Sequence, residues 1–173
     1  TKAYTTRVGE GPFPTEMLDT EEDVAHLIRE RGNEYGSVTR RPRRCGWFDA
    51  VATKYAAELN GFDSVALTKL DVLDALEEIK VCVGYEIDGK RIDTFPAVSH
   101  DLRKIKPIYE VLPGWESDTL GVTKIEDLPA NARRYVEFLS NFIGVEIGLI
   151  STGPERDQTI ILNDSVMEGW FKN

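Results

Sequence analysis

An alternating apolar run that ends in Asp88-Gly89 constrains the fold of this 173-residue chain more than any other feature. Every second position of the run is apolar, which is the period of a half-buried β-strand: Ile79, Val81, Val83, Tyr85 and Ile87. Asp-Gly is a preferred central pair of the type I′ turn that joins two antiparallel strands. The sequence therefore predicts a β-hairpin whose return strand covers Ile92–Phe95.

Helical and strand-like patterns alternate around the hairpin. Apolar residues at helical spacing predict helices, and short apolar runs between them predict buried strands. The helices are expected over residues 20–32, 48–59 and 127–143, and the strands over 1–8, 64–70, 108–112, 145–150 and 159–162. This order is typical of an α/β fold in which helices flank a parallel sheet, with the hairpin as an antiparallel extension. The last helix is expected to bury one face, formed by Ala132, Tyr135, Val136, Leu139, Phe142 and Ile143.

The composition speaks against several classes of protein. A net charge of −9 disfavours general affinity for nucleic acid or for an anionic membrane. No apolar run approaches the ~20 residues that a membrane span needs. Cys45 and Cys82 lie far apart without metal-ligand spacing, which favours reduced thiols in a cytosolic protein. Thr1 in place of Met leaves two interpretations open, a segment of a longer chain and a processed terminus.

Thr68-Lys69-Leu70-Asp71 is the first stretch with chemistry of its own. It stands at the carboxyl end of a predicted strand, where the ligands of α/β folds bind. A carboxylate there can accept hydrogen bonds from both the ring N–H and the amino group of guanine, and adenine offers no such pair of donors. The stretch is thus a candidate guanine-recognition motif. A surface lysine beside a helix-capping aspartate is the alternative.

Two glycine turns follow predicted strands elsewhere in the chain. Ser151-Thr152-Gly153-Pro154 comes after the strand over 145–150. Glycine lets the backbone approach a ligand closely, and exposed amides can donate to a base carbonyl. The second turn, Arg7–Pro12, has backbone groups that can meet a sugar. In each case an ordinary turn is the alternative.

Arginines crowd into the loop Ser37–Arg44 of this acidic chain, at Arg40, Arg41, Arg43 and Arg44. Guanidinium groups form bidentate hydrogen bonds with carboxylates and phosphates. Pro42 stiffens the loop and so lowers the entropy lost on binding. The loop is therefore predicted to bind an anion, with a solvated basic loop as the alternative.

In this order along the chain, these motifs and their neighbours resemble adenylosuccinate synthetases. The stretches that carry the resemblance cover nearly the whole chain: Lys2–Gly9 with Gly11–Glu16, Gly32–Gly36 with Arg41–Trp47, Leu67–Asp74, Tyr109–Glu110 with Leu112–Trp115, and Ser151–Pro154 with Arg156. The resemblance implies that residues 1–173 are one piece from the C-terminal portion of such an enzyme, with part of a P-loop-NTPase-like sheet. The family joins L-aspartate to IMP at the expense of GTP, in the biosynthesis of AMP.

The resemblance also implies roles for individual residues. Aspartate is expected to bind Ser37, Val38, Thr39, Arg41 and Arg43. IMP is expected at Arg41 and at Val8, whose backbone meets the ribose. GTP is expected to bind Arg43, Lys69, Leu70, Asp71, Ser151, Thr152 and Gly153. At Arg40 the family usually has glycine, which is a departure from its pattern.

The same resemblance implies which groups lie elsewhere. The glycine-rich phosphate loop with its Asp general base, a catalytic His and the Mg²⁺ ligands belong to the N-terminal part of the family. No catalytic or metal-binding residue is therefore expected in this chain, which should be inactive alone. The full-length enzyme is expected to be a cytoplasmic homodimer.

Two other functions stay open at this point. One is a guanine-nucleotide binding module that acts through partners. The other is a nucleic-acid-binding domain that uses the arginine loop, which the acidic net charge disfavours.

Overall fold

The computed structural model describes residues 1–96 and 101–171, which fold into two compact units. The first unit contains Thr1–Ala3, Thr53–Ile79 and the residues from Leu112 onward. The second unit contains Tyr4–Ala52 and Lys80–Val111. Because the chain passes between the units more than once, each unit is built from segments that are distant in sequence.

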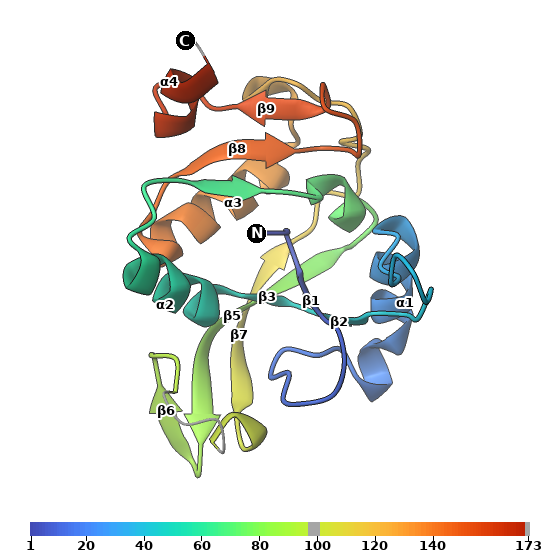
Figure 1. Cartoon of the computed structure of the whole chain (residues 1–173), viewed down its shortest axis with the longest axis vertical. Coiled ribbons are helices and arrows are strands. Elements are labelled where there is room, and N and C mark those ends of the chain that lie inside the picture. The colour runs from blue at the N-terminus through green and yellow to red at the C-terminus, as the bar shows by residue number, and fades with distance from the viewer. Residues whose placement is uncertain (97–100, 172–173) are drawn as a thin grey trace. The chain divides into compact units, whose positions relative to one another are not determined.

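The sheet of the first unit has the strand order β4-β8-β9 (Figure 1). Its strands are β4 (Val65–Leu67), β8 (Ile147–Ser151) and β9 (Thr159–Ile161). β4 and β8 are parallel, whereas β9 runs antiparallel to β8. The first residues of the chain extend this sheet beyond β4, since the Ala3 amide donates to the Thr68 carbonyl at 2.8 Å. Parallel strands with helices between them confirm the predicted α/β class.

Helices and short turns complete the first unit. They are α3 (Ala130–Ile143), α4 (Val166–Phe171) and the 3₁₀ turns η2 (Leu70–Leu73) and η4 (Ile125–Asp127), with the end of α2 (Ala50–Asn60). The buried face of α3 is largely the predicted one: Ala132, Tyr135, Val136, Leu139 and Ile143. Phe142, predicted to be buried as well, is half-buried and stacks on Phe138. Gly144 ends α3 with a φ of 78°, a left-handed conformation that favours glycine.

The second unit contains a β-ribbon and a small sheet. Its elements are β1 (Thr5–Arg7), β2 (Arg44–Gly46), β3 (Phe48–Asp49), β5 (Glu78–Ile87), β6 (Lys90–Ile92) and β7 (Lys106–Pro113), with α1 (Glu22–Arg31) and the 3₁₀ turns η1 (Asp19–Glu21) and η3 (Asp101–Arg103). β1 and β2 form the antiparallel ribbon, and α1 contacts β2. In the sheet, β5 pairs with β3, β6 and β7.

The predicted hairpin is confirmed as β5 and β6. Asp88 and Gly89 have φ values of 50° and 78°, as the two central residues of a type I′ turn require. Ile87 and Lys90 face each other across this turn, so the return strand covers Lys90–Ile92 and starts earlier than predicted.

Two other predictions were wrong in detail. Residues 1–8 are not one strand, because residues 1–3 pair with the β4 segment whereas β1 pairs with β2. The predicted helix over 48–59 begins only at Ala50, since Phe48–Asp49 pairs with β5. The Asp49 carboxylate then caps α2 by accepting a hydrogen bond from the Ala52 amide at 2.9 Å. Tyr55 and Leu59, apolar residues at the helical spacing of α2, are exposed.

Candidate functional site

The carboxyl ends of β4 and β8 lie at the same edge of the sheet in the first unit. The two strands are parallel neighbours, with Leu67 opposite Ile150. The residues that follow them therefore leave the sheet side by side, and η2 contacts β8. The fold in this way brings together the predicted stretches Lys69–Asp71 and Ser151–Gly153, which stand far apart in sequence. Such an edge is where α/β folds bind ligands.

Lys69 has an unusual backbone conformation at this edge. Its φ of 61° lies in the left-handed region, which costs a residue with a side chain roughly 1–2 kcal/mol. Backbone strain of this kind gathers at binding sites, where the surrounding structure maintains it. The turn at Lys69 starts η2 and buries Leu70 completely.

Asp71 lies between buried apolar neighbours. Leu70 and Val72 are both buried, so η2 is anchored on either side of the carboxylate. Asp71 is half-buried as a residue, and its Oδ1 atom is buried. A carboxylate held in this way at a strand end has the chemistry that the guanine motif needs, two acceptor oxygens in one plane.

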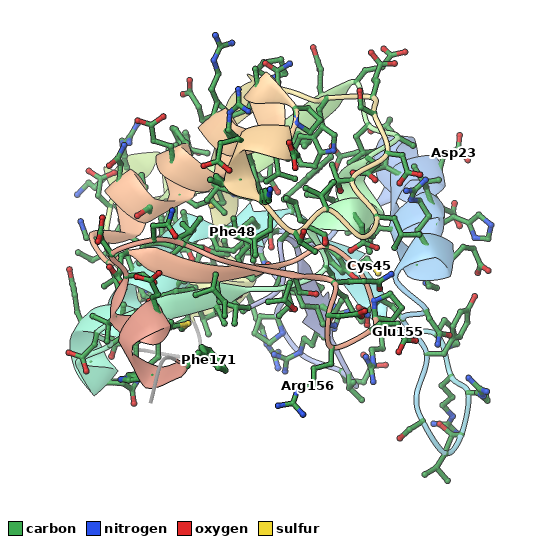
Figure 2. The ribbon with its side chains drawn as sticks, turned by 90° about the horizontal axis from the view of Figure 1, so that it is seen from above. Asp23, Cys45, Phe48, Glu155, Arg156 and Phe171 are labelled. Atoms are coloured by element: carbon green, nitrogen blue, oxygen red, sulfur yellow. The ribbon has the colours of Figure 1, made fainter. Side chains whose placement is uncertain are left out.

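The turn Ser151–Gly153 is held by hydrogen bonds of its own. Thr152 is fully buried, and its amide donates to the Gln158 carbonyl at 3.0 Å. The Ser151 hydroxyl donates to the Gly153 carbonyl at 2.9 Å. A Cβ atom at Gly153 would lie only 2.2 Å from Oε1 of Gln158, so the Gln158 side chain packs closely against this glycine. Arg156, farther along the same turn, projects away from the ribbon (Figure 2).

Asp74 is a buried residue of this unit that the sequence analysis did not single out. Its side chain is 4% exposed. The Trp115 indole donates to Oδ1 at 2.6 Å, and the Thr119 amide donates to Oδ2 at 2.7 Å. A signal was present in the sequence, since an acidic residue among Val72, Leu73 and Leu76 has no place in a core unless it is hydrogen-bonded.

The arginine loop belongs to the second unit and forms a hairpin. The Gly36 amide donates to the Arg41 carbonyl at 2.8 Å, and the Arg43 amide donates to the Glu34 carbonyl at 2.8 Å. The predicted residues Ser37, Val38 and Thr39 form its exposed tip, where Val38 is 90% exposed. Figure 2 shows this loop, in pale blue, extending beyond the helix that carries Asp23.

The four arginines of the loop fall into two groups. Arg40 and Arg41 are exposed near the tip. Arg43 pairs at 2.8 Å with the fully buried Glu34, which anchors the base of the loop. Arg44 pairs with Glu16, and this hydrogen-bonded partner raises the pKa of Arg44. The exposed pair is thus available to a ligand, whereas the other two also support the loop.

Val8 follows β1 at the edge of the same unit. Its side chain is 77% exposed, and Gly9 after it has a φ of 78°. Arg44 Nη1 donates to the Gly9 carbonyl at 3.1 Å and to the Gly11 carbonyl at 2.9 Å, which connects this glycine turn to the arginine loop. Val8 is thus an exposed residue beside a turn that Arg44 supports.

Comparison with known proteins assigns the chain to a family. A sequence model described as adenylosuccinate synthetase matches residues 1–160. The chain belongs to the adenylosuccinate synthetase family. It is 52% identical to adenylosuccinate synthetase 1, chloroplastic, of Ricinus communis and 56% identical to adenylosuccinate synthetase of Desulforamulus reducens, each over 94% of this chain and 37% of the relative. The chain thus spans little more than a third of the length of these synthetases.

The fold is also that of a synthetase. A solved structure of fully ligated adenylosuccinate synthetase from Plasmodium falciparum matches with a TM-score of 0.87 and 38% identity. The match covers 94% of this chain and 38% of the other. With this TM-score and identity, the chain has the fold of the corresponding part of an adenylosuccinate synthetase.

The described part of the chain has neither a metal-binding cluster nor a helix that could span a membrane. Residues 1–96 and 101–171 contain no cluster of three His, Cys, Asp or Glu side chains that fits a metal ion. The Mg²⁺ expected for the synthetase family therefore has no fitting ligand set among them, and we assign it no role here. Within the same ranges, no helix combines the length and apolar character of a membrane span.

Proposed function

We propose that this chain is the guanine-recognising and aspartate-binding part of an adenylosuccinate synthetase. The whole enzyme joins L-aspartate to IMP, converts GTP to GDP and phosphate, and serves purine biosynthesis. The observation that carries the proposal is the meeting of η2 and the turn after β8 at one sheet edge, in a chain of this family.

Guanine recognition is assigned to the first unit. The Asp71 carboxylate accepts hydrogen bonds from the ring N–H and the amino group of guanine, which no other common base presents together. The turn at Ser151 and Gly153 supplies backbone groups to the guanine carbonyl, which lies beside the ring N–H on the same edge of the base. Lys69 lies along the base with its aliphatic stem.

Binding of aspartate is assigned to the arginine loop of the second unit. The substrate has two carboxylates, and an arginine can bind a carboxylate through two parallel N–H groups. Arg41 is exposed on the loop, and the amides and hydroxyls of the tip Ser37–Thr39 add further donors. Arg43 extends the positive charge toward GTP while it remains paired with Glu34. Val8 and Arg41 contact IMP.

The chemical step depends on groups outside the residues discussed here. The proposal assigns the general base, the catalytic His and the Mg²⁺ ligands to the remaining part of the enzyme, and this chain to the C-terminal portion. We further propose that the whole enzyme works as a homodimer in the cytoplasm. In this account the described residues bind and orient substrates, and they raise the rate by holding the reactants in place.

Kinetics of the full-length protein that carries this chain test the proposal. Formation of adenylosuccinate should require IMP, aspartate and GTP together. Arg41→Gln should raise the KM for aspartate by roughly ten- to a hundredfold, raise the KM for IMP as well, and leave the KM for GTP nearly unchanged, since Arg41 is assigned to aspartate and IMP but not to GTP. Lys90→Gln, an exposed cation of the same unit outside the loop, is the matched control.

Two outcomes would contradict the proposed function. Guanine-nucleotide binding without any synthesis of adenylosuccinate would favour a binding module that acts through partners. A protein in which Arg41→Gln and Lys90→Gln behave alike would have no aspartate site in this loop.

A further inference from the structure

Asp74 lies one turn beyond Asp71 and joins η2 to a distant loop. The Asp74 amide donates to the Asp71 carbonyl at 3.3 Å, which connects the backbones of the two residues. Both carboxylate oxygens of Asp74 accept hydrogen bonds from the segment between Gly114 and Val122, which we call the bridging loop. The Thr119 hydroxyl adds a third, to Oδ1 at 2.8 Å.

The far side of the bridging loop holds the turn after β8. The Gly121 amide donates to the Thr152 carbonyl at 3.2 Å, and the Thr152 hydroxyl donates to the Val122 carbonyl at 2.8 Å. Cδ1 of Leu120 lies 2.9 Å from the place that a Cβ of Gly153 would occupy. One loop therefore touches both halves of the guanine site of the proposed function.

The start of the bridging loop is rigid. The Gly114 amide donates to the Glu77 carbonyl at 2.7 Å, and the Asn131 side chain donates to the Gly114 carbonyl at 2.7 Å. The Trp115 ring is buried and packs on Tyr135 of α3, with ring centroids 5.9 Å apart. Farther along the bridging loop than Gly114 and Trp115, the hydrogen bonds of Thr119 to Asp74 connect the loop with η2.

The hydrogen bonds at Asp74 need a carboxylate in this position. Three donors point at the two oxygens of Asp74, and a carboxylate can accept from all three. An amide in its place would turn one acceptor into a donor that faces another donor. Because the site is buried, no bulk water would compensate for the lost bond.

We propose that Asp74, through Thr119 and the bridging loop, positions the Ser151–Gly153 turn relative to Asp71 and thereby sets the selectivity of the site for guanine. Asp74 does not touch the base, and it is a positioning residue. The inference rests on the proposed function, since it concerns the same guanine site.

The test compares GTP with ITP in the full-length protein that carries this chain. The base of ITP lacks the amino group of guanine, so the ratio of kcat/KM for GTP over ITP measures how well Asp71 engages that group. Asp74→Asn should raise the KM for GTP by roughly tenfold and lower this ratio by a similar factor, with the KM for aspartate changed by less than about twofold. Thr119→Val should act in the same direction, and Thr119→Ser should restore the ratio.

A matched control comes from the second unit. Asp49 is also a buried aspartate whose oxygens accept bonds from a backbone amide and from a hydroxyl, that of Tyr85. Asp49→Asn should lower stability without altering the ratio. If Asp74→Asn fails to fold, the isosteric Thr119→Val variant decides.

Two results would overturn the inference. The first is an unchanged ratio of GTP over ITP in Thr119→Val and in a folded Asp74→Asn variant. The second is an equal rise of KM for every substrate, which would mark a purely structural role. Asp71→Asn distinguishes failure of this inference from failure of the proposed function. If Asp71→Asn weakens GTP binding while the Asp74 and Thr119 variants do not, the inference alone fails. If Asp71→Asn has no effect on GTP, the proposed function fails with it.

Discussion

Two cationic residues of the candidate sites, Arg40 and Lys69, have left-handed backbone conformations, with φ of 54° and 61°. Glycine adopts this region without steric penalty, whereas a residue with a Cβ atom is strained there. The positive φ of Arg40 is a conformation that suits the glycine which the resemblance implies is usual at this position. Nothing in the structure explains why arginine stands there.

Arg40→Gly should therefore relieve strain. We expect the free energy of unfolding to rise by about 0.5–1 kcal/mol, which is the left-handed penalty less the added entropy of glycine in the unfolded chain. Urea titration followed by circular dichroism measures this change.

Arg41→Gly is the control for that experiment, since Arg41 does not have a positive φ and glycine there should destabilise the chain. Equal effects of the two substitutions would show that the φ of Arg40 stores no strain.

At the scale of single elements, local patterns were predicted well and long-range pairing was not. The β5–β6 hairpin follows from the alternation and from Asp88-Gly89, which are neighbours in sequence. The start of α2 was misplaced because Phe48–Asp49 is a strand only through its pairing with β5, which no local pattern reveals. The carboxylate partners of Asp74 stand 41 and 45 residues away, so its role could not be derived from spacing either.

In the candidate site, too, local motifs were predicted and contacts that depend on tertiary packing were not. Thr68–Asp71 and Ser151–Gly153 were predicted as motifs because each follows an apolar strand, and the parallel pairing of β4 with β8 brings them to one edge. The anchoring of Arg43 by Glu34 was not predicted, since burial of Glu34 depends on tertiary packing around it.

Gly114, at the start of the bridging loop, tests how tightly that element is packed. A Cβ atom there would lie 1.7 Å from the Leu76 carbonyl oxygen, a backbone atom that cannot rotate away. Gly114→Ala should lower the free energy of unfolding by about 3 kcal/mol or more, at the upper end of overpacking effects. Thermal or urea denaturation checks the value.

Gly169→Ala in α4 is the matched variant, because its Cβ would meet open space and alanine favours helices. It should be neutral or slightly stabilising. Comparable losses in both variants would contradict the close approach at Gly114.

At the scale of the whole molecule, each of the two compact units has its own candidate site. The first unit holds the edge of β4 and β8 to which we assign guanine recognition, and the second holds the arginine loop and Val8. The chain carries a net charge of −9, yet its arginines gather where anionic substrates are expected. A local concentration of guanidinium groups on an acidic protein favours a specific anion over non-specific binding to nucleic acid.

The central claim is that the Asp71 carboxylate recognises guanine by accepting hydrogen bonds from its ring N–H and its amino group. The most direct measurement is the ratio of kcat/KM for GTP over xanthosine triphosphate, for the full-length protein and its D71N variant. The amide of D71N can accept from the ring N–H and donate to the 2-carbonyl of xanthine, so the preference should invert, by roughly tenfold or more in each direction. An unaltered preference for GTP in D71N would contradict the claim, because the base would then be recognised by other residues.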